Sequence, residues 1–433
     1  MSPALLAALA FGALFLLILL RVPLGIAMMI VGASGFAAKV GVAPALSVFA
    51  SEVVTSFSSA DLAVVPTFLL MGNFASAAGL SADLYRFSDA FVGHRRGGLA
   101  LATLGGCAGF GALCGSSLAT VGTMNQIAYP EMLRRRYAPH FAAATIAVGG
   151  TLGILVPPSI ILVLYAVLTE TFVIDLYVGA LIPSVLAVLL YGLGVVVYSR
   201  LRPESAPRGE RRTRRERLRE TANAWGVVVL VVVVMGGIYA GVFTALEAAA
   251  VGAVASFVFL VVRGRFTWNG FVGMLADTAT TTGMIFIMVI GASVFNYFMT
   301  VSEFPQQLVQ AIEATNLPPV SVVALILVVY IALGAVFDEV ATMLITLPFV
   351  LPLILAWGYD PVWWGIINVT VIMIGLFCPP IGLNVMVMHG LVKNVPLGRI
   401  YAGIVPFLLA DLVRLALLVA FPVLVTWLPA TMR

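Results

Sequence analysis

The sequence predicts an all-α integral membrane protein, and three observations support this fold class. Of its 433 residues, 62% are hydrophobic and only 10% are charged, whereas soluble domains are about 45–50% apolar and about 25% charged. Several apolar runs, such as 1–20 and 320–336, approach or reach the roughly 20 residues with which a helix crosses the hydrocarbon core. A pair of motifs also recurs in the two halves of the chain, which indicates an internal repeat.

The first apolar run is expected to be a spanning helix and not a cleaved signal peptide. No positive charge precedes it, and Arg21 follows it. This order of charge and apolar residues is the reverse of that in a secretory signal.

The basic residues orient the later elements, because cytoplasmic loops carry an excess of Lys and Arg. Placing the basic loops in the cytoplasm gives a path with about five spanning helices in each half. The spans predicted for the first half are 3–20, 22–40, 62–80, 140–168 and 177–199. Those predicted for the second half are 224–242, 244–262, 281–300, 361–388 and 400–424. Segments 81–96 and 302–316 mix charged and apolar residues, so we expect interfacial helices there.

Two apolar stretches, 98–132 and 318–356, begin and end on the same side of this path. Each is therefore predicted to be a re-entrant hairpin, the first entering from the cytoplasm and the second from outside. Helical backbone leaves no unpaired polar groups in lipid, so both hairpins are expected to be helical. The predicted domains are a first inverted repeat at 1–199, a cytoplasmic basic linker at 200–223 and a second inverted repeat at 224–433.

The repeat is measurable in two motifs. The first half contains Gly111-Ala-Leu-Cys and then Leu118-Ala-Thr-Val, and the second contains Gly334-Ala-Val-Phe and then Val340-Ala-Thr-Met. Downstream, each half has a glycine followed four residues later by a proline pair, at 153–158 and 375–380. The interval from Ala119 to Pro157 is 38 residues, as is that from Ala341 to Pro379, so both motifs are displaced by 222.

The linker between the halves is the one strong change of composition. Nine of the 23 basic residues lie within 200–219, interleaved with glutamates. In a membrane protein this pattern is typical of a cytoplasmic loop. The net charge of +4 therefore gives no reason to expect nucleic acid as a partner.

Both hairpins turn at small or polar residues, namely Gly115-Ser116-Ser117 and Asp338-Glu339. Broken helices at membrane depth expose amide groups that favour anions and carbonyl groups that favour Na⁺. The Gly-x-x-x-Pro-Pro segments supply matching breaks, because proline removes a backbone donor and glycine permits unwinding. Short interrupted segments at corresponding positions of two halves point to a transport site.

Three acidic residues lie within or next to the apolar segments, where charge is costly and usually functional. Asp338 is expected to coordinate an ion or face a solute, and Glu339 either joins it or faces the interface. Glu247 either contacts the solute or caps its own helix, because a carboxylate stabilises a first helical turn.

Other chemistries find no support in the sequence. There is no Gly-x-x-x-x-Gly-Lys-Ser/Thr motif for ATP binding. His94, His140 and His389 have no metal-ligand spacing, so no metal other than a coupling ion is expected. No Ser/His/Asp set or paired aspartates suggests an enzyme, and Cys107, Cys114 and Cys378 are interpreted as packing residues.

At these motifs the chain resembles the large membrane subunit of TRAP transporters, the tripartite ATP-independent periplasmic family. The resemblance rests on four stretches that spread over most of the chain: 153–159 with its Pro-Pro-Ser, 241–250 with Gly-Val-Phe-Thr-Ala-Leu-Glu, 334–338 ending in Asp338, and 375–384 ending in Asn384.

The resemblance implies an elevator-type transporter in the bacterial inner membrane, driven by Na⁺ as coupling ion with no organic cofactor. Its expected substrate is an organic acid, such as a C4-dicarboxylate, sialic acid or a similar carboxylate. A periplasmic substrate-binding protein would deliver the acid, and a separate small four-helix membrane subunit would extend the scaffold. The lipid bilayer is the expected environment of the chain.

The resemblance also implies roles for particular residues. One Na⁺ site would comprise Gly115, Ser116, Ser117, Gly153 and Val156. Its counterpart would comprise Asp338, Ala341, Thr342, Gly375 and Cys378. The substrate path would include Ser116, Ser159, Thr244 and Glu247. Two departures from the family pattern, Ala245-Leu246 and Cys378, affect these roles, since a hydroxyl ligand at 378 is lost while a carbonyl ligand remains.

One alternative remains open, a stand-alone Na⁺-coupled dicarboxylate symporter of related architecture. The sequence does not fix the identity of the substrate, the number of Na⁺ ions or the oligomeric state.

Overall fold

The computed structural model describes residues 3–392 and 394–432, and the regular elements in these ranges are helices. They are α1 (Pro3–Leu19), α2 (Leu24–Val40), α3 (Val42–Ser58), α4 (Val64–Ala77), α5 (Leu80–Val92), α6 (Gly98–Cys114), α7 (Ser117–Arg134), α8 (Pro139–Leu155), α9 (Ile160–Thr169), α10 (Val173–Leu201), α11 (Arg214–Asn223), α12 (Trp225–Tyr239), α13 (Ala245–Val262), α14 (Trp268–Ser302), α15 (Phe304–Glu313), α16 (Pro319–Gly334), α17 (Glu339–Ala356), α18 (Pro361–Phe377), α19 (Leu383–Leu391), α20 (Leu397–Ala420) and α21 (Val423–Met432).

The helices have the length and composition of membrane spans. Within the described ranges, 5 helices can each cross a bilayer alone, or up to 8 if each of 3 bent helix pairs forms one span. One of these pairs, α8 and α9, bends by 41° at its break. The all-α membrane fold class is thereby confirmed.

The helices recur at the displacement that the motifs predict. Moving α7 by 222 residues gives the bounds of α17, and moving α8 by 222 gives those of α18. Helices α6 and α7 form the hairpin expected at 98–132, and α16 and α17 form the one expected at 318–356. The opposite orientation of the two halves in the membrane stays a prediction.

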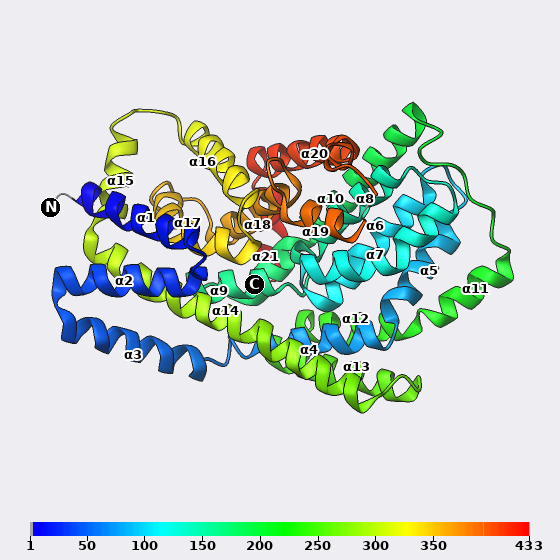
Figure 1. Ribbon diagram of the computed structural model, residues 1–433, viewed down its shortest axis with the longest axis horizontal. Coiled ribbons are helices and arrows are strands. Elements are labelled where there is room, and N and C mark those ends of the chain that lie inside the picture. Colours follow the sequence, from blue (N-terminus) through cyan, green and yellow to red (C-terminus); the bar gives the residue numbers. More distant parts are fainter. Residues whose placement is uncertain (1–2, 393, 433) are drawn as a thin grey trace.

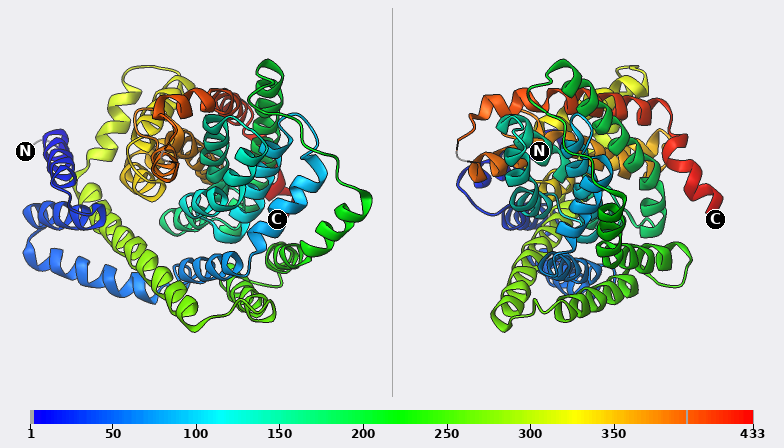
Figure 2. Two further views of the ribbon diagram at one scale, coloured as in Figure 1. Left: turned by 45° about the vertical axis from the view of Figure 1, so that its right-hand side comes forward. Right: turned by 90° about the vertical axis from the view of Figure 1, so that its right-hand side faces the viewer.

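The helices form two groups that lie beside each other (Figures 1 and 2). We call α2, α3, α4, α12, α13 and α14 the arm, and α6–α10 with α16–α21 the body. Within the arm, α2 packs along α14, and α4 packs along α13. A Cβ atom on Gly25 of α2 would lie 2.5 Å from the carbonyl oxygen of Ile287. Close approach through small residues is how membrane helices associate without a hydrophobic driving force.

At two segments the structure has helix that the predicted spans do not include. Residues 42–58, expected to lie outside the spans, form α3, and the span expected at 281–300 is the end of the longer helix α14. Helix α14 is long and apolar enough to cross a membrane, whereas α3 is a shorter apolar helix. In α3, Glu52 and Ser56 line a cavity of about 530 Å³ between arm and body. In α14, Thr278 receives a hydrogen bond from Asn73 of α4 at 2.9 Å.

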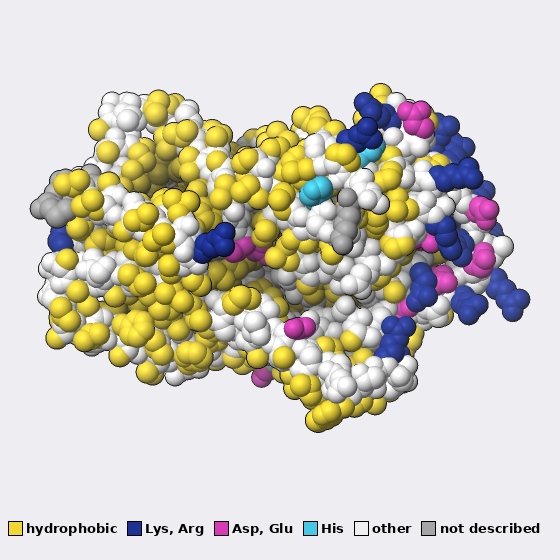
Figure 3. Space-filling model, viewed as in Figure 1, with side chains coloured by type: hydrophobic (Ala, Val, Ile, Leu, Met, Phe, Trp, Pro, Cys, Tyr) yellow, Lys and Arg dark blue, Asp and Glu magenta, His cyan; other side chains and the backbone are white. Residues whose placement is uncertain are grey.

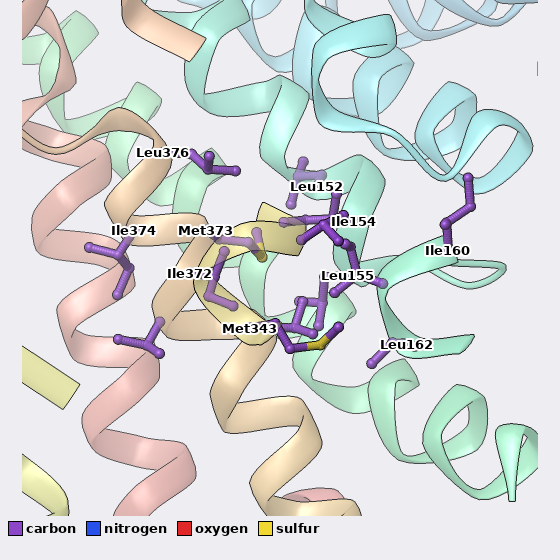
Figure 4. Packing of buried hydrophobic residues seen from close by; sticks show 14 of the residues in the cluster. Leu152, Ile154, Leu155, Ile160, Leu162, Met343, Ile372, Met373, Ile374 and Leu376 are labelled. Carbon is purple, nitrogen blue, oxygen red and sulfur yellow. The ribbon is translucent and has the colours of Figure 1, made fainter. Parts of the chain in front are cut away.

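The core of the body joins its two halves. Buried side chains of α8, α9, α17 and α18 meet there, among them Leu152, Leu162, Met343 and Met373 (Figure 4). Such dense contacts supply dispersion energy even where lipid and protein are equally apolar. The core therefore holds the two hairpins and the two broken helices in one unit.

Candidate functional site

The first hairpin turns on a glycine and a serine. Helix α6 ends at Cys114, and Gly115 adopts a left-handed backbone with φ 59°. Ser116 then caps α7, since its hydroxyl accepts a hydrogen bond from the Ala119 amide at 3.4 Å. The hydroxyl of Thr120 donates to the Ser116 carbonyl at 2.8 Å. Ser117 is the first residue of α7.

The second hairpin repeats this arrangement with an aspartate. The Ala341 amide donates to the Asp338 carboxylate at 2.8 Å, so Asp338 caps α17. The hydroxyl of Thr342 donates to the Asp338 carbonyl at 2.9 Å. Thr120 was not among the predicted site residues, although it corresponds to Thr342 at the displacement of 222 and the repeat could have identified it.

Each hairpin faces a broken helix. Helix α8 ends before Val156 and α18 ends before Cys378, and both of these residues have extended backbone. A cis Pro-Pro bond follows each of them. The predicted breaks at the proline pairs are therefore present at equivalent places.

Contacts between glycines bring each hairpin against its break. A Cβ atom on Gly111 of α6 would lie 2.3 Å from the Cα atom of Gly153 in α8. In the second half, a Cβ atom on Gly375 would lie 2.6 Å from the backbone of Gly334. Only glycine permits this approach, so Gly153 and Gly375 have a structural reason to be where they are.

Ser159 lies directly after the first proline pair and caps α9. Its buried hydroxyl accepts from the Leu162 amide at 3.3 Å and donates to the Ile154 carbonyl at 2.5 Å. The hydroxyl of Tyr177 donates to the Ser159 carbonyl at 3.4 Å. The Ser159 side chain is thus occupied by the backbone on both sides of the break.

Asn384 links the two halves at the first hairpin. This residue belongs to α19, yet its amide donates to the Ser117 hydroxyl at 2.6 Å and to the Ala147 carbonyl at 3.0 Å. Its side chain is fully buried, and its Oδ1 atom has no hydrogen-bond partner among the described residues. Nothing in the local sequence signals a contact of this range, so it was not predicted.

The two acidic residues of the second hairpin differ in surroundings. Asp338 is half-buried, and one of its oxygens caps α17. Glu339 is the first residue of α17 and is buried, which argues against its facing the interface. One Glu339 oxygen has no partner in the part of the chain that is described. An acceptor of this kind, held in apolar surroundings, suits a cation or a proton.

Thr244 and Glu247 form a capping box at the start of α13. The Glu247 carboxylate accepts from the Thr244 amide at 2.8 Å, and the Thr244 hydroxyl accepts from the Glu247 amide at 3.3 Å. Both sides of this box belong to one helix end, and no recorded hydrogen bond joins it to Ser116 or Ser159. Of the two alternatives for Glu247, capping is the one that the geometry displays.

Known proteins with similar sequences are transporter permeases. The family profile described as "Tripartite ATP-independent periplasmic transporter, DctM component" matches residues 11–424. The C4-dicarboxylate TRAP transporter large permease protein DctM of Pseudomonas aeruginosa is 37% identical, over 85% of this chain and 84% of that protein. The sialic acid TRAP transporter large permease protein SiaM of Vibrio cholerae is 30% identical, over 88% of each chain. The ectoine/5-hydroxyectoine permease UehC of Ruegeria pomeroyi is 29% identical, over 96% of this chain and 97% of that one.

Among solved structures, the fold is similar to that of the YdaH transporter of Alcanivorax borkumensis. The TM-score is 0.64 with 16% sequence identity, over 88% of this chain and 89% of that one. The named relatives are transporter permeases and not enzymes. The chain therefore belongs to the family of tripartite ATP-independent periplasmic transporters, as a large permease protein that crosses the inner membrane several times.

Proposed function

We propose that this permease couples Na⁺ entry to the import of an organic acid, such as a C4-dicarboxylate, sialic acid or a similar carboxylate. The observation that carries the proposal is the pair of hairpin tips held against two broken helices in one body. Half-helix ends and unwound carbonyls at such breaks suit an anionic solute and its coupling cation.

The two Na⁺ sites would follow the repeat. In the first, carbonyl and hydroxyl oxygens of Gly115, Ser116 and Ser117 would act with carbonyls of Gly153 and Val156. In the second, Asp338, Ala341 and Thr342 would act with carbonyls of Gly375 and Cys378. Oxygen ligands are what a hard cation requires, and a carbonyl at 378 serves whatever the side chain.

The substrate would bind between the two tips, near Ser116 and Ser159. The serine hydroxyls already hold backbone groups in place, which would keep the amide ends of α7 and α9 oriented toward a carboxylate. Helix N-termini carry partial positive charge and bind anions readily.

Movement of the body against the arm would carry the site across the membrane. Support comes from the cavity between α3 and α14 of the arm and α9 and α17 of the body, which holds about 530 Å³. Its lining includes Glu52, Glu170 and Asn296. The cavity leaves this part of the boundary between the two groups of helices unfilled, and sliding or hinge motion between packed groups is a known kind of transition.

The proposed assembly has three parts. A separate small four-helix membrane subunit would lie against the arm, and a periplasmic substrate-binding protein would deliver the acid. This proposal rests on family membership, because the family is named as one of tripartite periplasmic transporters.

The test is uptake into proteoliposomes that hold this chain and its small subunit, with the binding protein outside. We expect uptake of the organic acid only under an inward Na⁺ gradient, and uptake without a gradient would contradict Na⁺ coupling. Concentrative uptake by this chain alone would instead support the stand-alone symporter.

The same assay tests Asp338. Replacement Asp338→Ala should abolish the Na⁺ dependence of uptake or raise the half-saturating Na⁺ concentration by tenfold or more, a loss of about 1.4 kcal/mol. Asp360→Ala is a matched control, because Asp360 caps α18 through the Val362 amide at 2.7 Å. Equal effects of the two variants on Na⁺ dependence would remove Asp338 from the ion site.

A further inference from the structure

A second polar cavity lies away from the hairpin tips, at the end of the molecule where basic side chains gather (Figure 3). Its volume is about 750 Å³. Six arginines line it, three from the end of the first hairpin and three from the linker: Arg134, Arg135, Arg136, Arg208, Arg211 and Arg212. Among the described residues, the carboxylates that line it are those of Glu210 and Glu216.

The walls of this arginine cavity are fixed by backbone hydrogen bonds. The amide of Ala138 donates to the Ser205 carbonyl at 3.0 Å, and that of Gly97 donates to the Ala206 carbonyl at 3.3 Å. Ser205 and Ala206 are buried. The linker is therefore attached to the loops before α6 and after α7, and its arginines face a defined space.

Half of the arginines are already paired with carboxylates. Arg135 makes two hydrogen bonds to the Asp89 carboxylate, at 2.9 and 2.8 Å, and Arg212 approaches the same carboxylate at 3.3 Å. Arg134 pairs with Glu131 at 2.8 Å. These ion pairs hold the cavity together but leave little charge for a ligand.

The remaining three arginines carry uncompensated charge. Arg136, Arg208 and Arg211 form no ion pair among the described residues. Of the two lining glutamates, Glu216 is engaged in the capping box of α11 with Thr213. The cavity thus has a surplus of guanidinium groups, whose planar donors match the oxygens of a phosphate group.

We propose that the arginine cavity binds the phosphate-bearing headgroup of an anionic phospholipid in the cytoplasmic leaflet. The positive-inside rule places this end of the chain in the cytoplasm. Basic pockets at helix ends on that side are suited to anionic headgroups. Exposed apolar side chains are close in sequence to lining residues, Leu133 directly before Arg134 on α7 and Leu218 two residues after Glu216 on α11, and they offer a surface for acyl chains.

A soluble phosphate would use the same guanidinium groups but not these leucines. The lipid is favoured because the cavity lies at the end of the first hairpin that is expected to face the cytoplasm, where α7 ends at Arg134 directly after the exposed Leu133. This binding site is independent of the Na⁺ sites, so its failure would leave the proposed transport function untouched.

The test measures lipid binding to the purified full chain by native mass spectrometry. Phosphatidylglycerol and phosphatidylcholine are compared for the wild-type protein and for the triple variant Arg136→Gln/Arg208→Gln/Arg211→Gln. We expect wild type to prefer phosphatidylglycerol and the triple variant to bind it about tenfold more weakly or worse.

A matched control removes equal charge nearby. The variant Arg214→Gln/Arg215→Gln/Arg219→Gln changes α11, whose residues are not buried, and should weaken binding less than about twofold. Equal losses in both triple variants would overturn the proposal, because they would reflect general surface charge. Absence of any preference in wild type would overturn it as well.

A last measurement distinguishes binding of a lipid headgroup from binding of free phosphate. Millimolar inorganic phosphate is added during the measurement with phosphatidylglycerol. We expect phosphatidylglycerol to stay bound, and its full displacement would show that the site takes soluble phosphate instead. Thermal unfolding in lipid-free detergent should be the same for both triple variants, which excludes misfolding as the cause of lost binding.

Discussion

At the scale of residues, two contacts in the body bring the backbones of glycine pairs close together. Gly375 meets Gly334 in the second half as Gly153 meets Gly111 in the first. A methyl group at either contact must push a hairpin away from the break that it faces. Because both sides are backbone, no side chain can rotate to make room.

We therefore expect Gly375→Ala to destabilise the protein by about 1–3 kcal/mol and to reduce uptake. Gly122→Ala is the control, since a Cβ atom there would have no neighbour within 4 Å. The measurements are thermal unfolding in detergent and uptake in proteoliposomes. Similar unfolding temperatures for the two variants would show that the glycine contact is unimportant.

A second prediction at this scale concerns Asn384. Replacing it by alanine removes the hydrogen bonds to Ser117 and Ala147 and frees the tip of the first hairpin. We expect Asn384→Ala to raise the half-saturating Na⁺ concentration. Asn368→Ala is a close match, because Asn368 is also fully buried and donates to the Tyr330 hydroxyl at 3.0 Å. If both variants lost stability alike and neither changed the Na⁺ dependence, Asn384 would be a packing residue only.

Sequence reasoning reached some of these residues and not others. Ser116 and Asp338 could be predicted, because a polar residue at the turn of an apolar hairpin is unusual and its position repeats. Asn384 could not, since its contact with Ser117 spans 267 residues along the chain. Glu247 shows the opposite problem, in that a carboxylate three residues after a threonine fits both a cap and a ligand.

At the scale of elements, a variant of the capping box at the start of α13 distinguishes helix capping from substrate binding as the role of Thr244 and Glu247. We expect Thr244→Ala to lower the unfolding temperature slightly, because one cap is lost, and to leave the KM for the organic acid unchanged. Thr213→Ala removes the same kind of box from α11 and serves as the comparison. A rise in KM with Thr244→Ala alone would return Thr244 and Glu247 to the substrate path.

Predictions of elements succeeded where apolar runs were uninterrupted and bounded by proline, glycine or charge. The hairpins and the broken helices are of this kind, and their breaks follow from the proline pairs. Helix α3 and the first part of α14 were not predicted, because they contain polar residues, some of which, such as Glu52 and Thr278, face a cavity or another helix. The hydrophobicity of the sequence does not reveal such contacts of polar residues, because the contacts form only when the helices pack together.

At the scale of the whole molecule, the proposed motion predicts that a distance between arm and body changes, while a distance within the arm stays the same. Spin labels at exposed positions Val254 in α13 and Leu409 in α20 should report different distances with and without Na⁺ and substrate. Labels at Val254 and at Val232 in α12, both in the arm, should keep theirs. Pulsed electron–electron double resonance measures the distance between the labels of each pair. A constant distance between arm and body would contradict the elevator proposal.

The pairing of arm helices across the halves has a consequence for biosynthesis. The most extensive packing partner of helix α2 is α14, which begins at Trp268, well over 200 residues later in the chain. At about 5–20 residues per second, a ribosome needs on the order of ten seconds or more to supply that partner. Until then the glycine-lined side of α2 faces lipid or the insertion machinery, so the arm closes only after the first helices of the second half, α12 to α14, have been made.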